Sequence, residues 1–148
     1  MALPAIIIDS REQTPFSFEN IPVQYGTLSA GDYSLAGFTD LIAIERKSLQ
    51  DMVQCCGKER DRFKSCLFRL RSYKCKAVII EATLGQIESG KWYGDLKPSH
   101  VLGAINSWRA RYGIEFIYAG TPELASQECK RLMFKFYDYL KETVMRFK

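Results

Sequence analysis

Two carboxylates and a lysine in the first third of the chain have the types and spacing that phosphodiester hydrolysis uses. Asp32 follows a glycine, and one residue separates Glu45 from Lys47. On a strand, residues i and i+2 point to the same face, so Glu45 and Lys47 would share one side of a sheet. If segments 31–35 and 41–46 form a hairpin, Asp32 lies within reach of that side. Carboxylate oxygens suit Mg²⁺, and a nearby lysine can position the attacking water or offset charge on phosphorus.

Each of these residues also has a structural interpretation. A pattern of Asp followed by Glu-x-Lys arises often by chance. Asp32 could be a turn residue, and Glu45 with Lys47 could form the solvated face of an edge strand. The apolar residues 41–44 favour a buried strand instead, in which two charges need a reason. Three further acids are explained by spacing alone as a helix cap or as turn residues at a strand end: Asp51, Asp9 and Glu12.

Strand and helix patterns alternate along most of the chain. Apolar, β-branched segments predict strands at 5–9, 23–28, 31–35, 41–46, 76–82 and 114–118. Capping residues and apolar periodicity predict helices at about 48–57, 59–73, 98–113 and 122–146. Segment 84–97 contains three glycines without a clear period, which predicts a loop. This order predicts an α/β fold with a mixed central sheet flanked by helices.

Composition excludes several classes of protein. The 148 residues suit one domain over residues 1–148, and no apolar segment is long enough to span a membrane. No secretory leader is visible at the N-terminus. Five cysteines without a CxxC pair, beside a single histidine, argue against a disulfide framework and a structural zinc site. Free thiols indicate a reducing, intracellular compartment.

Positive charge gathers on one predicted helix. Residues 58–76 hold eight bases and two acids, which suits a phosphate backbone or, alternatively, a solvated helix face. The candidate phosphate contacts are Arg60, Arg62, Lys64, Arg69, Arg71 and Lys74. Helical spacing puts Arg62 and Arg69 on a different side from the group of Arg60, Lys64 and Arg71.

Segment 91–93, Lys-Trp-Tyr, combines a cation with two aromatic rings. Such a segment can stack on an unpaired base. The simpler interpretation, which we favour, is that Trp92 covers an edge of the core. Trp108 lies within a predicted helix and is expected in the core.

Four segments in order resemble the nuclease domain of XPF-family structure-specific endonucleases: IIIDSRE, GDYSLAG, IERKSLQDM and ERDRFKSCLFRL. The family signature is GD, then ERK, three residues and D. It is matched by Gly31-Asp32, Glu45-Arg46-Lys47 and Asp51. The upstream D-x-R-E is matched by Asp9, Arg11 and Glu12, and the RF pair by Arg62-Phe63. The resemblance covers roughly residues 6–82.

The resemblance implies a restriction-endonuclease-like core and Mg²⁺- or Mn²⁺-dependent cleavage of branched or flapped DNA, including junctions of single- and double-stranded DNA. It implies a site lined by Asp9, Glu12, Asp32, Glu45, Lys47 and Asp51, with Arg46 beside them. Of these, the implied metal ligands are Asp32, Glu45, Asp9 and Glu12. Arg11 joins the candidate DNA contacts. Two other functions remain open: a restriction-like or junction-resolvase-like nuclease with another DNA substrate, and a catalytically silent DNA-binding or scaffold subunit.

The last third of the chain departs from the family pattern. No helix-hairpin-helix domain is recognisable after residue 118, which suggests a stand-alone nuclease module from the cytoplasm of a bacterial or virus-infected cell. The predicted helix 122–146 carries apolar residues on more than one face. One stripe is Leu132, Phe136, Leu140 and Val144, and the additional residues are Phe134, Tyr137 and Phe147. Nuclease domains of the resembling family dimerise through late helices, so we expect a homodimer through this helix.

Overall fold

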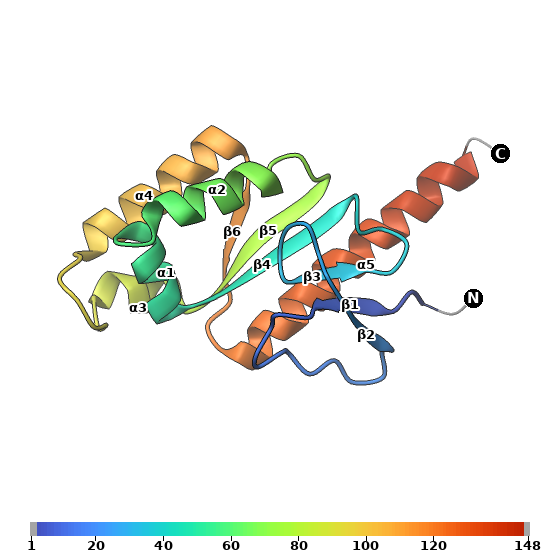
Figure 1. Cartoon of the computed structure of the whole chain (residues 1–148), viewed down its shortest axis with the longest axis horizontal. Helices are drawn as coiled ribbons and strands as arrows, with labels where there is room; N and C mark the ends of the chain where they lie inside the picture. Colours follow the sequence, from blue (N-terminus) through green and yellow to red (C-terminus); the bar gives the residue numbers. More distant parts are fainter. Residues whose placement is uncertain (1–2, 147–148) are drawn as a thin grey trace.

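A computed structural model describes residues 3–146, and its elements are arranged as in Figure 1. The strands are β1 (Ile6–Asp9), β2 (Val23–Gly26), β3 (Tyr33–Leu35), β4 (Ile42–Ser48), β5 (Cys75–Glu81) and β6 (Glu115–Tyr118). The helices are α1 (Leu49–Cys56), α2 (Arg60–Leu70), α3 (Leu84–Ser89), α4 (Pro98–Tyr112) and α5 (Pro122–Arg146). None of the described helices is long and apolar enough to cross a membrane.

The strands form one mixed sheet in the order β2-β1-β3-β4-β5-β6. β3 pairs antiparallel with both β1 and β4, which confirms the predicted hairpin between β3 and β4. The pairs β1–β2, β4–β5 and β5–β6 are parallel. The predicted α/β fold with a mixed sheet flanked by helices is therefore confirmed.

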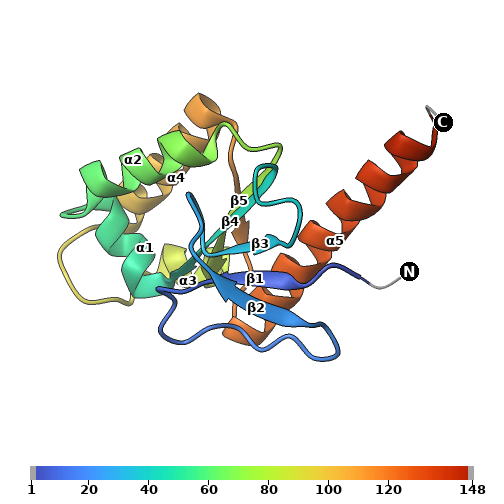
Figure 2. The same ribbon diagram turned by 45° about the vertical axis from the view of Figure 1, so that its right-hand side comes forward.

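Alternation along β4 divides the core between the two faces of the sheet. Ala43 packs into a core formed with α1, α2 and α4, whereas Ile42 and Ile44 pack into a second core against α5. Side chains of a strand alternate between faces, so Glu45 and Lys47 belong to the α1–α2 side and Arg46 to the α5 side. Figures 1 and 2 show α1 to α4 grouped together, and α5 running along the sheet and extending past the strands.

The prediction of a loop over 84–97 is wrong in its first part, because residues 84–89 form α3. Thr83 caps this helix by accepting from the Gln86 amide, and the Gln86 side chain accepts from the Thr83 amide. This capping box and the burial of Ile87 stabilise a short helix in spite of Gly85. The glycines obscured the signal because they lower helix propensity at exposed positions without excluding a helix.

Two other predictions, the burial of Trp108 and the start of the helix after β4, are confirmed. Trp108 is only 1% exposed, with Phe63 edge-on to its ring and Phe116 stacked on it. All five cysteines are free in the structure. The helix that follows β4 begins as predicted, with the Ser48 hydroxyl accepting from the Asp51 amide at 3.1 Å.

Candidate active site

The β3–β4 pairing brings Asp32 and Glu45 together. Tyr33 lies opposite Ile44, and the same antiparallel register continued by one residue sets Asp32 opposite Glu45. The Asp32 amide donates to the Ile44 carbonyl at 2.7 Å, and the Arg46 amide donates to the Asp32 carboxylate at 2.8 Å. Residues directly opposite on one face have neighbouring side chains. The local pairing of the hairpin therefore fixes the carboxylate pair.

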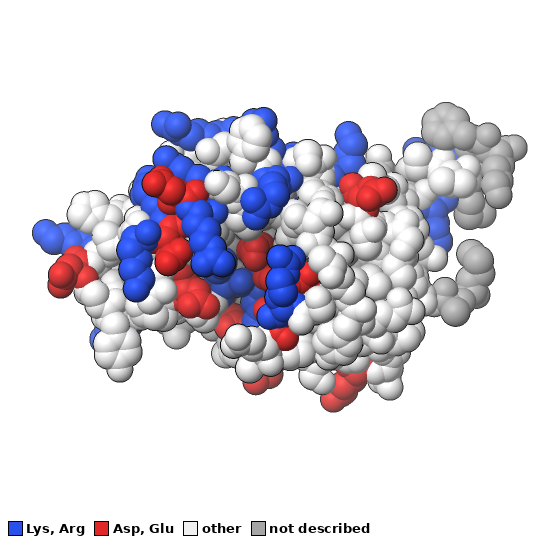
Figure 3. All heavy atoms as spheres, in the orientation of Figure 1, with Lys and Arg blue, Asp and Glu red and all other residues white. Residues whose placement is uncertain are grey.

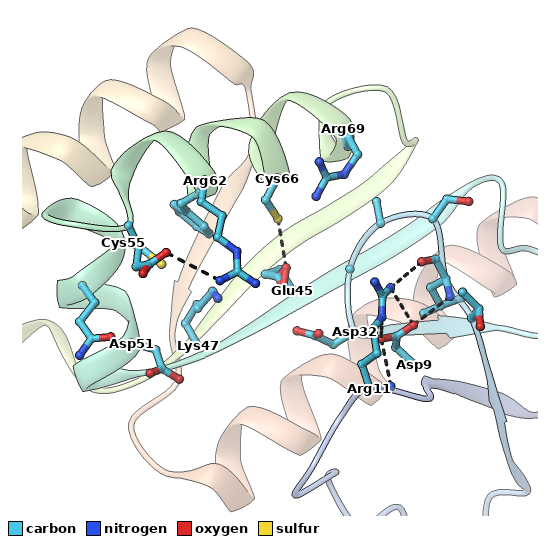
Figure 4. Close-up of a pocket in the computed structure, with 18 residues that line it drawn as sticks. Asp9, Arg11, Asp32, Glu45, Lys47, Asp51, Cys55, Arg62, Cys66 and Arg69 are labelled. Atoms are coloured by element: carbon cyan, nitrogen blue, oxygen red, sulfur yellow. Dashed lines mark hydrogen bonds and ion pairs between the residues drawn. The ribbon is translucent and has the colours of Figure 1, made fainter.

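A cavity of about 620 Å³ opens over this pair. It lies between the β3–β4 hairpin, the first turns after β1 and the helices α1 and α2 (Figure 4). Predicted site residues that line it are Asp9, Arg11, Asp32, Glu45, Lys47, Asp51, Arg62 and Arg69. Residues that are far apart in the sequence thus converge on one hollow.

The backbone conformation at residue 31 explains why a glycine precedes Asp32. Its φ is +76°, a conformation that side-chain-bearing residues rarely adopt. A Cβ atom at this position would lie 3.0 Å from both the amide nitrogen and the carbonyl oxygen of Ile44. The glycine therefore allows the chain to turn tightly against β4 and to present Asp32 beside Glu45.

A residue other than glycine in the left-handed region costs about 1–3 kcal/mol. We expect Gly31→Ala to lower the free energy of unfolding by more than this, because backbone atoms of Ile44 must also move. Urea unfolding followed by circular dichroism measures the change. Gly37→Ala is the matched control, since Gly37 has a φ of +85° but no atom within 4 Å of an added Cβ. Equal losses in the two variants would show that the contact with Ile44 has no energetic weight.

The two carboxylates repel each other in a partly desolvated place. Glu45 is 8% exposed. Burial, followed by the Glu45 charge, raises the pKa of Asp32 to about 8. Without a cation, the pair therefore holds a proton near neutral pH. A site that keeps two carboxyl groups in this state is suited to a divalent cation, which would replace the proton.

Lys47, two residues after Glu45 on β4, lines the same cavity. Burial opposes its charge, but the carboxylates of Glu45 and Asp32 outweigh that effect and raise the pKa of Lys47 above its ordinary value. Its ammonium also lies 5.5 Å from the centre of the Phe63 ring. Lys47 is therefore a charged donor held beside the two carboxylates, as the Glu-x-Lys spacing predicts.

Cys66 is a site residue that the sequence analysis did not single out for chemistry. Its Sγ lies 3.2 Å from Glu45 Oε2, which accepts a hydrogen bond from the thiol (Figure 4). Burial and the adjacent Glu45 carboxylate raise the pKa of the thiol, so it stays protonated and can donate. Its position in α2, three residues after buried Phe63, was the available signal, since it sets Cys66 on the side that faces the sheet.

Asp9 lines the cavity, but its carboxylate already accepts hydrogen bonds from neighbouring protein groups. Its carboxylate accepts from Arg11 Nε at 2.8 Å and from the Leu28 amide at 2.9 Å. Burial opposes the charge of Asp9, yet these hydrogen bonds prevail and lower its pKa. Asp9 therefore orients Arg11 and the turn at Leu28, and it carries less free negative charge toward the cavity than Asp32 or Glu45.

The structure does not bring Glu12 and Arg46 to this cavity. Glu12 accepts from the Tyr33 hydroxyl at 2.6 Å and from Arg46 at 3.3 Å on the opposite face of the sheet. Arg46 also pairs with Glu81 at 2.7 Å and lies over the Phe16 ring. These contacts tie the segment after β1 to β4 and β5. Their motif positions suggested the site, but alternation along β4 turns Arg46 away from Glu45.

Basic residues of α2 separate by face, as the helical spacing predicts. Arg62 and Arg69 line the cavity, together with Arg11 from the opposite side. Arg60 instead lies over the Trp108 ring, 5.3 Å from its centre. The remaining candidates, Lys64, Arg71 and Lys74, do not line the cavity. Figure 3 shows acidic side chains within the central hollow and basic side chains around it.

The donor set fits a cation with few protein ligands. Within residues 3–146, no three Asp, Glu, His or Cys side chains form a ready cluster for a metal ion. The adjacent carboxylates of Asp32 and Glu45 are the candidate ligands. Asp51 lines the cavity farther along, and its amide completes the cap of α1. Mg²⁺ is commonly held by one or two carboxylates with water in its other positions.

The solved structures that are similar to this protein include the following two chains. The first is XPF from Aeropyrum pernix, with a TM-score of 0.71 and 21% identity over 88% of this chain and 60% of that chain. The second is XPF from Aeropyrum pernix in complex with DNA, with a TM-score of 0.70 and 20% identity over 91% of this chain and 66% of that chain. The present chain thus spans less than two thirds of either. This similarity confirms the predicted restriction-endonuclease-like core.

A search of curated proteins gives no match. The model of the ERCC4 domain family matches residues 8–130, from β1 into α5, and this range includes the whole cavity. The resemblance to XPF nuclease domains in the sequence motifs is therefore confirmed over most of the chain. The protein belongs to the ERCC4 domain family.

Proposed function

We propose that the protein is a metal-dependent DNA endonuclease that cuts branched, flapped or otherwise structured DNA. The observation that carries this proposal is the carboxylate pair of Asp32 and Glu45 beside Lys47 in a cavity rimmed by arginines. A similar solved chain is described as a complex with DNA. The retained carboxylates also weigh against a catalytically silent subunit.

In the proposed reaction, Asp32 and Glu45 hold Mg²⁺, or Mn²⁺ in its place. When bound, the ion supplies Lewis acidity to the scissile phosphate and to the attacking water. Lys47 donates to that water or to the phosphate oxygens, where negative charge grows. Cys66 fixes the rotamer of Glu45 through its 3.2 Å contact. The water oxygen bonds to phosphorus and loses a proton to solvent, while the bond to the 3′ oxygen breaks and that oxygen takes up a proton, which leaves 5′-phosphate and 3′-hydroxyl ends.

The deciding experiment is cleavage of an end-labelled panel of fork, flap, four-way junction and plain duplex DNA, with Mg²⁺ and with EDTA. We expect Mg²⁺-dependent cuts near the branch of the fork or flap. Preference for the four-way junction or the plain duplex would instead favour a resolvase-like or restriction-like nuclease. No cleavage of any substrate with Mg²⁺ or Mn²⁺ would leave the silent DNA-binding subunit as the better description.

Because Arg62 and Arg69 line the cavity, we expect them to contact phosphates more directly than Arg60 and Lys64, which do not line it. We expect Arg62→Gln with Arg69→Gln to make the slope of log K against log salt shallower by about 1.8, because about 0.9 is lost for each phosphate contact. Fluorescence anisotropy over a salt series measures it. The comparison variant, Arg60→Gln with Lys64→Gln, should change the slope less. The opposite order would contradict the assignment.

We also propose that α5 forms a homodimer contact. Ala125, Cys129 and Met133 of its first half are buried against the sheet. This buried stripe lies one residue away from the predicted Leu132–Phe136 stripe, and Leu132 and Phe136 are only partly buried against the same core. Beyond Met133, Tyr139 and Val144 are 58% and 57% exposed on the projecting end shown in Figures 1 and 2. An exposed apolar helix end of this kind suits a twofold contact. Phe147 lies outside the described residues.

Light scattering at micromolar concentration should give about twice the 17.0 kDa chain mass for the wild type. Leu140→Glu should reduce it to one chain, because an unpaired charge in an apolar contact costs several kcal/mol. Lys135→Glu on an exposed position of α5 is the matched control, and circular dichroism checks folding. A wild-type mass near 17.0 kDa with and without DNA contradicts the dimer.

The five free thiols fit a reducing compartment inside the cell.

A further inference from the structure

Tyr93 is the most exposed large apolar side chain among the described residues, with 88% of its surface accessible. It lies in the connection between α3 and α4, where the two aromatic residues of the Lys-Trp-Tyr segment have separate roles. Trp92 is partly buried against the core of α1, α2 and α4, and its Nε1 donates to the Leu96 carbonyl at 3.0 Å. This confirms the core-edge interpretation for Trp92, but it leaves the Tyr93 ring unexplained.

The backbone of Tyr93 is held firmly although its ring is free. The Gln50 side-chain amide donates to the Tyr93 carbonyl at 3.0 Å, and its oxygen accepts from the Tyr93 amide at 3.0 Å. A single side chain thus satisfies both backbone groups, which fixes the orientation of this residue. At the start of the connection, Gly90 has a φ of +69° and packs closely against Pro98. An exposed ring on a backbone anchored in this way is presented with little loss of conformational entropy on binding.

The side chain that holds the Tyr93 backbone belongs to a helix that borders the candidate active site. Gln50 lies in the first turn of α1, and the next residue, Asp51, lines the active-site cavity. Close to Tyr93 in the sequence, Lys91, Gly94 and Asp95 are also exposed, and none of them has an apolar side chain. Stable protein contacts need a larger apolar centre than one ring. A planar group that stacks on a single aromatic face fits these surroundings better.

We propose that Tyr93 is a stacking platform for an unpaired nucleobase of the DNA that enters the active-site cavity. The proposal rests on the proposed function and adds to it a basis for choosing DNA with a single-stranded part. Inside a duplex, neighbouring base pairs cover both faces of each base, so away from the duplex ends an unpaired base is what presents a free face to Tyr93. Lys91, an exposed residue two positions before Tyr93, adds charge that favours a phosphate backbone.

The test compares binding of two labelled DNAs by fluorescence anisotropy, a duplex with a single-stranded arm and the matching full duplex. A gel after each measurement confirms that the DNA is intact. We expect Tyr93→Ala to weaken binding of the armed DNA about 5-fold to 150-fold, the range of one base–aromatic stack, and to leave full-duplex binding unchanged. Tyr93→Phe keeps the ring and should bind like the wild type. The salt slope should not change, because stacking neutralises no phosphate.

A second readout locates the contact. 2-Aminopurine placed at successive unpaired positions should be quenched at one or two of them by the wild type and by Tyr93→Phe, and at none by Tyr93→Ala. Tyr25→Ala removes another exposed tyrosine, 64% accessible on the edge strand β2, and should leave this quenching intact. Equal affinity of Tyr93→Ala and the wild type for the armed DNA, or equal weakening on both DNAs, overturns the platform while the nuclease proposal stands. A wild type that neither binds nor cuts DNA overturns both.

Discussion

Replacing Asp32 with asparagine or Glu45 with glutamine is expected to abolish DNA cleavage, with a loss on the order of 10³-fold or more. Each substitution removes one charged ligand of the proposed cation but keeps the size of the side chain, and a lost ligand costs several kcal/mol of transition-state stabilisation. Asparagine still offers an oxygen to the Arg46 amide, which bonds the Asp32 carboxylate at 2.8 Å. Single-turnover cleavage with Mg²⁺ and DNA binding without it separate chemistry from binding.

The metal-free proteins provide the control for folding. Since burial and repulsion from Glu45 raise the pKa of Asp32 to about 8, removing the Glu45 charge should leave stability at pH 8 unchanged or increase it. Glu12→Gln is the comparison variant, because Glu12 lies on the other face with Tyr33 and Arg46, and a far smaller loss of cleavage is expected. Wild-type turnover by the Asp32 or Glu45 variant would refute the site.

Lys47→Ala is expected to lower the single-turnover rate by about 10²–10³-fold, because it removes a donor aimed at the charge that develops on phosphate. Metal affinity should stay the same or rise slightly, since a cation close to Asp32 and Glu45 opposes a second cation. Isothermal titration with Mg²⁺, measured beside the cleavage rate, tests both halves of this expectation.

Lys47→Met is the matched control for packing. It keeps an unbranched side chain over the Phe63 ring, which lies 5.5 Å from the ammonium in the native protein, but it carries no charge. The methionine variant should be as slow as the alanine variant and more stable toward urea. Loss of metal binding without a separate rate defect would mean that Lys47 organises the carboxylates and takes no part in the reaction.

The sequence by itself determined the centre of the candidate site. Glu45 and Lys47 are two residues apart on a strand, and this period alone places them on one face. The glycine and the acid at 31–32 followed by an apolar strand predicted the hairpin that adds Asp32. The helical period of α2 separated Arg62 and Arg69 from Arg60 and Lys64. These features depend on repeats within one element or between two neighbouring ones, which a sequence contains in full.

Only the tertiary structure decided which other motif residues reach the cavity. The D-x-R-E motif suggested equal roles for Asp9 and Glu12, but Asp9 binds Arg11 and the Leu28 amide, while Glu12 lies beyond the sheet with Tyr33. The path of the chain after β1 determines this difference. That path depends on packing against β3 and β4, and no local period records it.

The same reason applies to the residues that the sequence analysis missed. The contact of Cys66 with Glu45 joins α2 to β4, and the clamp of Gln50 on Tyr93 joins α1 to a connection 43 residues later. Such pairs follow from the way in which helices settle on the sheet, and each residue alone has an ordinary type for its element. A sequence determines which faces are polar and which are apolar, whereas the packing of those faces decides which polar side chains meet.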